Sequence, residues 1–280
     1  MPNSPALFVQ SFAQRVEKYP AHTILFLHGG GAAGWMWHPV VDRLPEFHCL
    51  VPDLPEQGQS RSTGPFSIQH AADLAAEVIR TQARAGKAVV VGLSEGAQVT
   101  VQLLASAPEL VEKAVVSSAL LKALPGTEAF YSPGLLAWTY RLSVAPFKRS
   151  DFWIRLNMKY AAGIPEAYFA QFKKEFQEMT ESGFVNFMVA NQRFRLPAGL
   201  EKFTAPTLVI TGAKEYNAMK ESARELAAAL PRAKAVQISL GKGSSLAAEH
   251  NWALTAPDLF ARTVRAWITG TPLPEQLTGL

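Results

Sequence analysis

The stretch GLSEG at residues 92–96 places Ser94 at the centre of a G-x-S-x-G pattern. The apolar run at 87–93 predicts a β-strand before this serine, and residues 95–107 predict a helix after it. A tight strand-to-helix turn forces a serine into a strained backbone conformation, and a glycine on either side removes side chains that would clash there. The positive end of the helix would point at the serine. Ser94 is therefore predicted to be a nucleophile, and the alternative is a serine required only by the turn.

Three consecutive glycines follow another apolar run, TILFL, and the first of them comes directly after His28. Glycines at the end of a strand allow backbone N–H groups to face a substrate oxygen, as an oxyanion hole requires. Gly30 is the expected donor, Gly31 is the second candidate, and the N–H group of Glu95 would complete the hole. Without Ser94, a tight turn would explain these glycines equally well.

The side chain of Glu95 has two interpretations. It begins the expected helix, where a carboxylate is stabilised by roughly 0.3–1 kcal/mol, and we expect it to serve that helix start. If it faces the site instead, its charge would oppose a nearby oxyanion.

Short apolar runs rich in Val and Ile alternate with helical patterns along the chain. The expected strands are 6–12, 23–29, 47–53, 87–93, 113–119, 206–212 and 234–240. The expected helices of the same alternation are 67–84, 95–107, 218–230 and 256–268. Most of the strands are continuously apolar, as in a parallel sheet that is covered on both faces. The pattern predicts the α/β class, with right-handed crossovers and a doubly wound, mostly parallel sheet.

Residues 121–200 interrupt this alternation, because they are aromatic-rich, helical in pattern and without a convincing strand. We interpret them as a helical cap inserted into a core formed by residues 1–120 and 201–280. The alternative is a group of helices packed away from any site. Aromatic side chains of a cap would favour an apolar substrate, although aromatics at helical spacing also form the interior of helical segments. The candidate substrate contacts are Trp138, Tyr140 and Trp153.

The composition is that of a globular chain without a nucleic-acid or membrane partner. Of its 280 residues, 48% are hydrophobic, which is enough for a sizeable core. The 27 Lys and Arg residues against 23 Asp and Glu give a net charge of +4, and they are scattered along the chain. The single cysteine, Cys49, excludes a disulfide within the chain. With no signal-peptide pattern and no apolar run of about 20 residues, the expected location is the cytoplasm.

In the order of its segments the chain resembles the α/β-hydrolase superfamily. The resemblance covers essentially the whole core and is carried by LHGGGAAGWMW, VPDLPEQGQS, VVGLSEGA, TLVITGAKE and HNWALTAPDLFARTVRAWI. The stretch HGGGAAGWMW is similar to the esterase and hydroxynitrile lyase branch, which has a comparable aromatic pair after its oxyanion loop. The resemblance implies a catalytic triad in the chain order serine, acid, histidine.

His250 is the expected catalytic histidine. Of the six histidines, only His250 lies after the last strand of the predicted parallel sheet, where a loop can return to the serine. The family usually shows glycine-x-glycine-histidine there, whereas six residues, SSLAAE, separate GKG from His250 in this chain. The run after His250, with Trp252 and Pro257, keeps the family's spacing into the last helix.

Glu215 is the expected triad acid, because the family places an aspartate three residues after the glycine that ends the strand TLVITG. Glutamate can orient an imidazole as aspartate does, although its extra methylene requires a slightly withdrawn backbone. Glu221 is the rival position. Glu249 adjoins His250 in the sequence, and we expect its side chain to point elsewhere.

One loop departs from the family. Where the family usually has glycine-histidine-glycine, this chain has Glu56-Gln57-Gly58, which we interpret as a local difference at the surface. Asp53, at the end of the preceding strand, is expected to hydrogen-bond a loop and not to catalyse.

These residues together predict a serine hydrolase that cleaves small carboxylic esters through an acyl-enzyme. Dispersed histidines and the lack of a phosphate or dinucleotide loop predict neither a metal nor an organic cofactor. Asn251 stands where the related plant lyases carry a lysine, which disfavours cyanohydrin cleavage. A lactonase, a carbon–carbon bond hydrolase, an acyltransferase or a non-catalytic binder of small ligands stays open, as does the oligomeric state.

Overall fold

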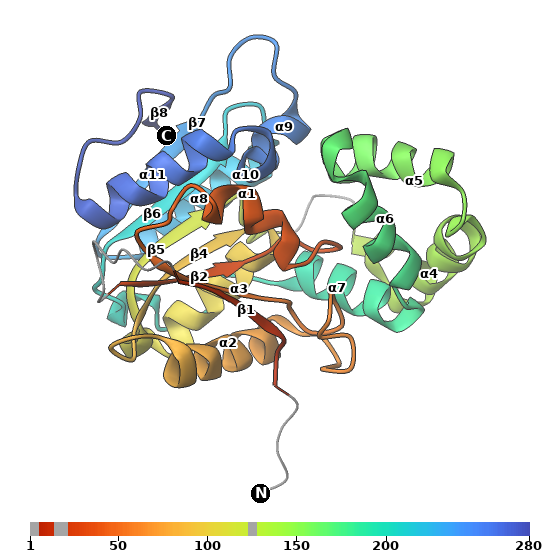
Figure 1. The fold of residues 1–280 in the computed structure, drawn as a ribbon, viewed down its shortest axis with the longest axis horizontal. Coiled ribbons are helices and arrows are strands. Elements are labelled where there is room, and N and C mark those ends of the chain that lie inside the picture. Colours follow the sequence, from red (N-terminus) through yellow and green to blue (C-terminus); the bar gives the residue numbers. More distant parts are fainter. Residues whose placement is uncertain (1–5, 14–21, 123–127) are drawn as a thin grey trace, which may run out of the picture.

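A central eight-stranded sheet organises the protein (Figure 1), whose computed structural model describes residues 6–13, 22–122 and 128–280. The strands lie in the order β1-β3-β2-β4-β5-β6-β7-β8. Their bounds are Val9–Phe12 (β1), Thr23–Leu27 (β2), His48–Pro52 (β3), Ala88–Leu93 (β4), Val111–Ser117 (β5), Thr207–Gly212 (β6), Ala233–Ile238 (β7) and Leu277–Gly279 (β8). The strands from β3 to β7 are parallel, and the two edge strands, β1 and β8, pair antiparallel.

The continuous apolar runs of the sequence arise because both faces of the sheet are buried. In β2, Ile24 and Phe26 belong to the hydrophobic cluster on one face, whereas Leu25 and Leu27 belong to the cluster on the other. Successive side chains of a strand point to opposite faces, so a strand covered on both sides needs an apolar residue at every position. All five residues of β2 are buried.

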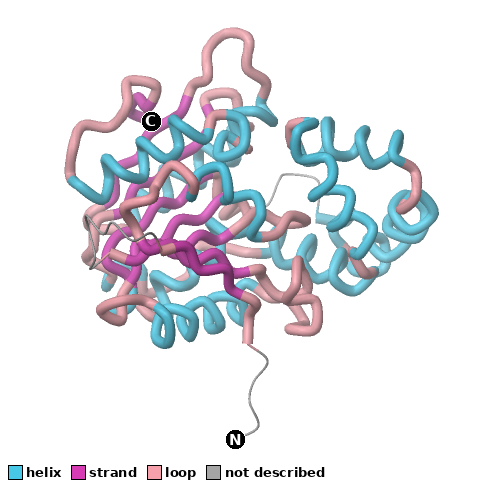
Figure 2. Tube along the Cα trace, in the orientation of Figure 1, coloured by secondary structure: helices cyan, strands magenta, loops and turns pink. Residues whose placement is uncertain are grey.

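Helices cover each face of the sheet (Figure 2). Helices α2, α3 and α8 contribute buried residues to one hydrophobic cluster, and α1, α10 and α11 contribute to the other. The bounds on the first face are Ile68–Gln82 (α2), Glu95–Ser106 (α3) and Asn217–Ala229 (α8). Those on the second face are His38–Val41 (α1), Trp252–Thr255 (α10) and Pro257–Thr269 (α11), with α9 (Leu246–His250) just before α10.

The predicted fold class is confirmed, and so are the seven predicted strands, with ends that differ by a few residues. Strand β8 was not predicted from the sequence. It has three residues, of which only Leu277 is buried, and so it carries no apolar run by which it could be recognised. It forms because residues 277–279 pair with the exposed edge of β7.

A helical insertion joins β5 to β6. Its described part, residues 128–200, contains no strand and extends to one side of the sheet (Figure 1). Its principal helices are Pro133–Thr139 (α4), Asp151–Asn157 (α5), Phe169–Glu178 (α6) and Glu181–Arg193 (α7). Within the predicted cap, 121–200, residues 123–127 lie outside the described residues.

Helix α3 approaches the sheet very closely where it begins. A Cβ atom placed on Gly96 would lie 2.1 Å from the carbonyl oxygen of Leu27 in β2. A Cβ on Gly92 would lie 2.3 Å from the carbonyl oxygen of Gly96. Real Cβ atoms do not approach backbone this closely, so these two positions require glycine for packing.

We expect Gly96→Ala to destabilise the fold by about 3 kcal/mol, because backbone would have to move to admit the methyl group. Gly134→Ala is the matched control. Gly134 lies in the exposed helix α4, where an added Cβ would meet nothing within 4 Å, and its replacement should stabilise by about 0.4–1 kcal/mol. Urea unfolding of both variants measures the difference. An unchanged free energy of unfolding in Gly96→Ala would contradict the close approach of α3.

Candidate active site

Ser94 lies at the turn between β4 and α3 with a backbone φ of 56° and ψ of −115°. A non-glycine residue in this region is strained, and such strain is typical of functional positions. Its N–H group donates to the carbonyl oxygen of Ser117 at 2.9 Å, which holds the turn against the end of β5. The side chain caps none of the N–H groups of α3. The hydroxyl group is therefore not used by the helix, although a serine at this position could have capped it.

His250 and Glu215 form a direct pair. The Nδ1 atom of His250 lies 2.5 Å from Oε1 of Glu215. Because Nδ1 faces a carboxylate, it carries the proton in the neutral ring, which leaves Nε2 as the basic nitrogen. The pairing agrees with the sequence-based choice of Glu215. The rival, Glu221, lies on α8 and pairs with Lys122 instead.

The carboxylate of Glu215 is held by two further donors. Its Oε2 atom accepts hydrogen bonds from the hydroxyl group of Thr211 at 2.6 Å and from the N–H group of Gly212 at 2.7 Å. Burial raises the pKa of Glu215, but the hydrogen bond and charge of His250, with these two donors, outweigh burial and hold the pKa below its usual value. Glu215 is therefore an ionised partner of the imidazole at neutral pH.

Of the six additional residues before His250, the last four belong to the short helix α9. The hydroxyl group of Ser245 accepts from the N–H group of Ala248 at the start of α9, and His250 is its last residue. Glu249 points away from His250, as expected. Its carboxylate accepts from the Lys214 N–H group and from the Ser244 hydroxyl group at 2.8 and 2.7 Å, and so ties the loop before α9 to the loop that carries Glu215.

Ser94 and His250 line the same cavity, whose volume is about 150 Å³. The helical insertion supplies Ala161, Ala162 and Ile164 to its wall. A hydrogen bond from Asn251, the residue after α9, holds the insertion against this cavity. The side-chain amide of Asn251 donates to the carbonyl oxygen of Ala162 at 2.6 Å.

The glycine loop after β2 lies directly beside Ser94. A Cβ on Gly29 would be 3.5 Å from the Cβ of Ser94, and Gly29 and Gly30 line the cavity. His28 anchors this loop, because Nδ1 donates to the Gly29 carbonyl oxygen and Nε2 accepts from the Leu54 N–H group, both at 2.9 Å. Burial lowers the pKa of His28, in keeping with a neutral structural histidine.

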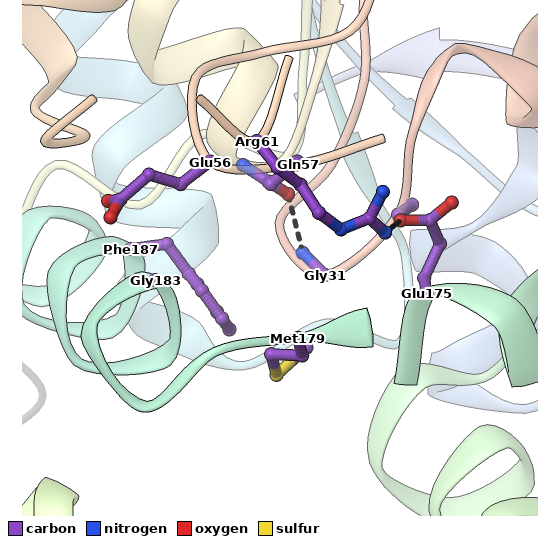
Figure 3. Close-up of a pocket in the computed structure, with 9 residues that line it drawn as sticks. Gly31, Glu56, Gln57, Arg61, Glu175, Met179, Gly183 and Phe187 are labelled. Carbon is purple, nitrogen blue, oxygen red and sulfur yellow. Dashed lines mark hydrogen bonds and ion pairs between the residues drawn. The ribbon is translucent and has the colours of Figure 1, made fainter. Parts of the chain in front are cut away.

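The two candidate oxyanion donors of this loop differ in their surroundings. The N–H group of Gly31 donates to Oε1 of Gln57 at 2.9 Å (Figure 3), so it already has a partner within the protein. Gly30 is exposed and lines the cavity that holds Ser94. This arrangement favours Gly30, with the N–H group of Glu95, over Gly31.

The interpretation of the loop Glu56-Gln57-Gly58 as a surface difference was wrong. Gln57 is buried, and besides the Gly31 bond its amide nitrogen donates to Oε1 of Glu95 at 2.9 Å. The partners lie 26 and 38 residues away in the sequence, and no local pattern indicates them. Asp53 does hold a loop, as predicted, because it accepts from the N–H groups of Gly34 and Gln59 at 2.7 Å each.

We expected the side chain of Glu95 to serve the start of helix α3 as a carboxylate. The structure shows that this interpretation was wrong. The side chain is completely buried, and its Oε2 atom has no hydrogen-bond partner among the described residues. Burial raises the pKa of Glu95 to about 8, and the hydrogen bond from Gln57 offsets this only in part. The carboxyl group is therefore mostly neutral at pH 7.

The structure does not bring the three predicted aromatic contacts to the cavity. Trp138 points outward from α4 and is 60% exposed. Tyr140 is buried, and its hydroxyl group donates to the Met179 carbonyl oxygen, while the Trp153 ring nitrogen donates to the Ser143 carbonyl oxygen. Both polar groups are thus used inside the insertion, and these aromatics form its own interior and surface.

Neither a metal cluster nor a membrane-spanning helix is found in the described residues. No group of three or more His, Cys, Asp or Glu side chains within residues 6–13, 22–122 and 128–280 is arranged to hold a metal ion. No helix in these ranges combines the length and the apolar character needed to cross a bilayer.

We expect Glu95→Gln to stabilise the fold increasingly between pH 5 and pH 8. The unfolded carboxyl group ionises near its ordinary pKa of 4.5, whereas the folded one ionises near 8. The folded state therefore binds more protons in this window, and its free energy of unfolding falls as the pH rises. At about 1.4 kcal/mol per pH unit, the free energy of unfolding of the wild type falls by about 4 kcal/mol relative to that of the glutamine variant over this window. Urea unfolding of both proteins at several pH values measures it, and parallel stability curves would contradict a neutral Glu95.

The sequence resembles known proteins over most of its length. A model of the alpha/beta hydrolase family matches residues 24–263. An AB hydrolase superfamily protein of Gibberella zeae is 25% identical over 98% of this chain and 91% of its own length. The esterase Rv0045c of Mycobacterium tuberculosis is 39% identical over a shorter segment, which covers 34% of this chain and 32% of the esterase.

Solved structures resemble the protein in fold. The enol-lactonase of Burkholderia xenovorans superposes with a TM-score of 0.71 at 21% identity, covering 94% of this chain and 96% of the lactonase. At this identity the likeness shows the shared fold. With a family model that spans most of its residues and this architecture, the chain belongs to the alpha/beta hydrolase family.

Proposed function

We propose that the protein hydrolyses carboxylic esters through an acyl-enzyme formed on Ser94. One observation carries the proposal: a strained serine and a histidine bound to a buried carboxylate line one cavity. This set contains a nucleophile, a base and a group that orients the base. The esterase of Mycobacterium tuberculosis, 39% identical over about a third of the chain, supports ester cleavage as the reaction.

In the proposed cycle, Ser94 Oγ attacks the ester carbonyl carbon while Nε2 of His250 accepts the hydroxyl proton. The tetrahedral intermediate collapses, the bond to the alcohol oxygen breaks, and the imidazolium gives its proton to the leaving alcohol. Water then attacks the acyl-enzyme, again with His250 as base, and releases the acid and the free serine. Glu215 stabilises the imidazolium in both halves of the cycle.

The proposed oxyanion hole consists of the N–H groups of Gly30 and Glu95. Glu95 directly follows Ser94 and is the first residue of α3, so its N–H group has no partner within the helix. Donors held in place before the reaction stabilise the charge that develops on the carbonyl oxygen. The bond between Gly31 and Gln57 supports the loop and leaves Gly30 for the substrate.

The proposed substrate carries a short apolar acyl group. The cavity of about 150 Å³ is smaller than the roughly 300–1,000 Å³ of a typical small-molecule site. Apolar side chains on its wall include Ala32, Met36, Ile164 and Leu254. We also propose that residues 121–200 act as the cap of this site, since the insertion contributes three residues to the cavity wall.

We expect the purified protein to hydrolyse p-nitrophenyl acetate and butyrate faster than the decanoate and dodecanoate. Ser94→Ala should lose turnover by on the order of 10⁶-fold, because the nucleophile is absent. Release of p-nitrophenol, with a circular dichroism spectrum to establish folding, measures both. Retained turnover in folded Ser94→Ala would refute the acyl-enzyme.

We expect Glu215→Gln to lower kcat by on the order of 10³- to 10⁴-fold, because an amide no longer fixes the tautomer of His250 or stabilises its charge. Glu221→Gln is the matched control. That carboxylate is half exposed and pairs with Lys122, so kcat should stay within about twofold. Equal losses in the two variants would remove Glu215 from the triad.

A further inference from the structure

We propose that Glu95 is a positioning residue that, in its neutral form, supports the oxyanion loop at Gly31 through Gln57 and at Gly30 by direct packing. Here the oxyanion loop means residues 28–31. The inference rests on the proposed ester hydrolysis and adds a residue that the serine, histidine and acid do not require.

Gln57 connects Glu95 to the loop in one orientation only. Its Oε1 atom accepts from the N–H group of Gly31 and its Nε2 atom donates to Oε1 of Glu95, both at 2.9 Å. A backbone N–H group can only donate, so the amide oxygen must face Gly31 (Figure 3). The amide nitrogen must then face Glu95, whose oxygen accepts. An acceptor oxygen at residue 95 therefore holds Gln57 in the orientation that supports Gly31.

Glu95 also packs directly against the proposed oxyanion donor. A Cβ placed on Gly30 would lie 3.1 Å from Oε2 of Glu95 and 3.2 Å from the ring of Phe187 on α7. Glu95 and Phe187 of the insertion therefore both lie on the side of Gly30 to which a Cβ would point. The loop is supported at Gly31 by a hydrogen bond and at Gly30 by packing.

The surroundings of Glu95 suit a neutral group. The side chain has no exposure; Oε1 accepts a hydrogen bond from Gln57, and Oε2 has no partner among the described residues. A buried carboxylate requires several donors or a cation, whereas a buried carboxylic acid costs far less. The pKa of Glu95, raised by burial to about 8, agrees with this.

The charged groups nearest the Gln57 link pair with residues other than Glu95. On the loop after β3, Arg61 pairs with Glu175 and Glu178 of α6, and Glu56 accepts from the side-chain amide of Asn186 on α7. None of these groups forms an ion pair with Glu95 in the described residues.

The groups at the strand ends are similarly engaged. At the ends of β2 and β3, His28 and Asp53 bond to backbone groups of neighbouring loops. His250 on α9 is bound to Glu215. Among the described residues Glu95 therefore has no counter-charge, and its ionisation would place an uncompensated negative charge behind Gly30.

Ionisation of Glu95 should lower kcat and leave KM nearly unchanged. The charge would oppose the oxyanion, which develops only in the transition state, and the ground-state ester carries no such charge. With ionisation near pH 8, about one tenth of the enzyme would be neutral at pH 9.

The experiment measures kcat and KM for p-nitrophenyl butyrate from pH 6 to 10, with Ser94→Ala as the blank for spontaneous hydrolysis. With a circular dichroism spectrum at each pH to establish that the enzyme stays folded, the wild-type kcat should fall about tenfold between pH 7 and pH 9, at nearly constant KM. Glu95→Gln, which keeps an oxygen acceptor for Gln57, should show no such fall. The matched control is Glu175→Gln, another buried carboxyl group with a raised pKa, which should retain it.

A fall in kcat that persists in Glu95→Gln would overturn the proposal about Glu95. Loss of turnover in Ser94→Ala would still support ester hydrolysis. A second readout does not depend on activity. The infrared spectrum of the wild-type protein at pH 7 should contain a protonated carboxyl band that Glu95→Gln lacks. If the two spectra match in this region, Glu95 is ionised and the proposal fails, whichever esters are turned over.

Discussion

The close approach of helix α3 to strand β2 is the constraint on which the rest of the site depends. Gly96 lies so near the Leu27 carbonyl oxygen that no side chain fits between them. The chain must therefore turn sharply between β4 and α3, and Ser94 takes up a positive φ at that turn. The same approach brings the glycine loop at the end of β2 beside the serine. One packing contact thus places Ser94, the start of the helix and the glycine loop after β2 together.

The parallel sheet then gathers the other groups from distant parts of the chain. The oxyanion loop follows β2, Ser94 follows β4, Glu215 follows β6 and His250 follows β7. Carboxyl ends of parallel strands meet at one edge of a sheet, where the ligands of such folds bind. The insertion leaves the sheet after β5, so it starts from the same edge and can reach the cavity without a long connection.

The sequence indicates those parts of the site that follow from local pattern. Continuous apolar runs predict the parallel strands, and the glycines around Ser94 predict its turn, because both depend on neighbours in the chain. Gln57 and the aromatic residues of the insertion could not be placed in this way. The role of Gln57 depends on residues far along the chain, and the direction of Trp153 is set by a hydrogen bond within the insertion. Strand β8 exists only through its pairing with β7.

The two buried carboxyl groups of the site, Glu215 and Glu95, differ in charge because they differ in hydrogen-bond donors. Glu215 is held by His250, Thr211 and Gly212, and these donors keep its pKa low despite burial. For Glu95 the donor is Gln57 alone among the described residues, and burial decides its pKa. In the proposed reaction a positive imidazolium and a negative oxyanion develop together. A charged Glu215 stabilises the first, and a neutral Glu95 avoids destabilising the second. If both carboxyl groups were ionised, they would stabilise the imidazolium but oppose the oxyanion.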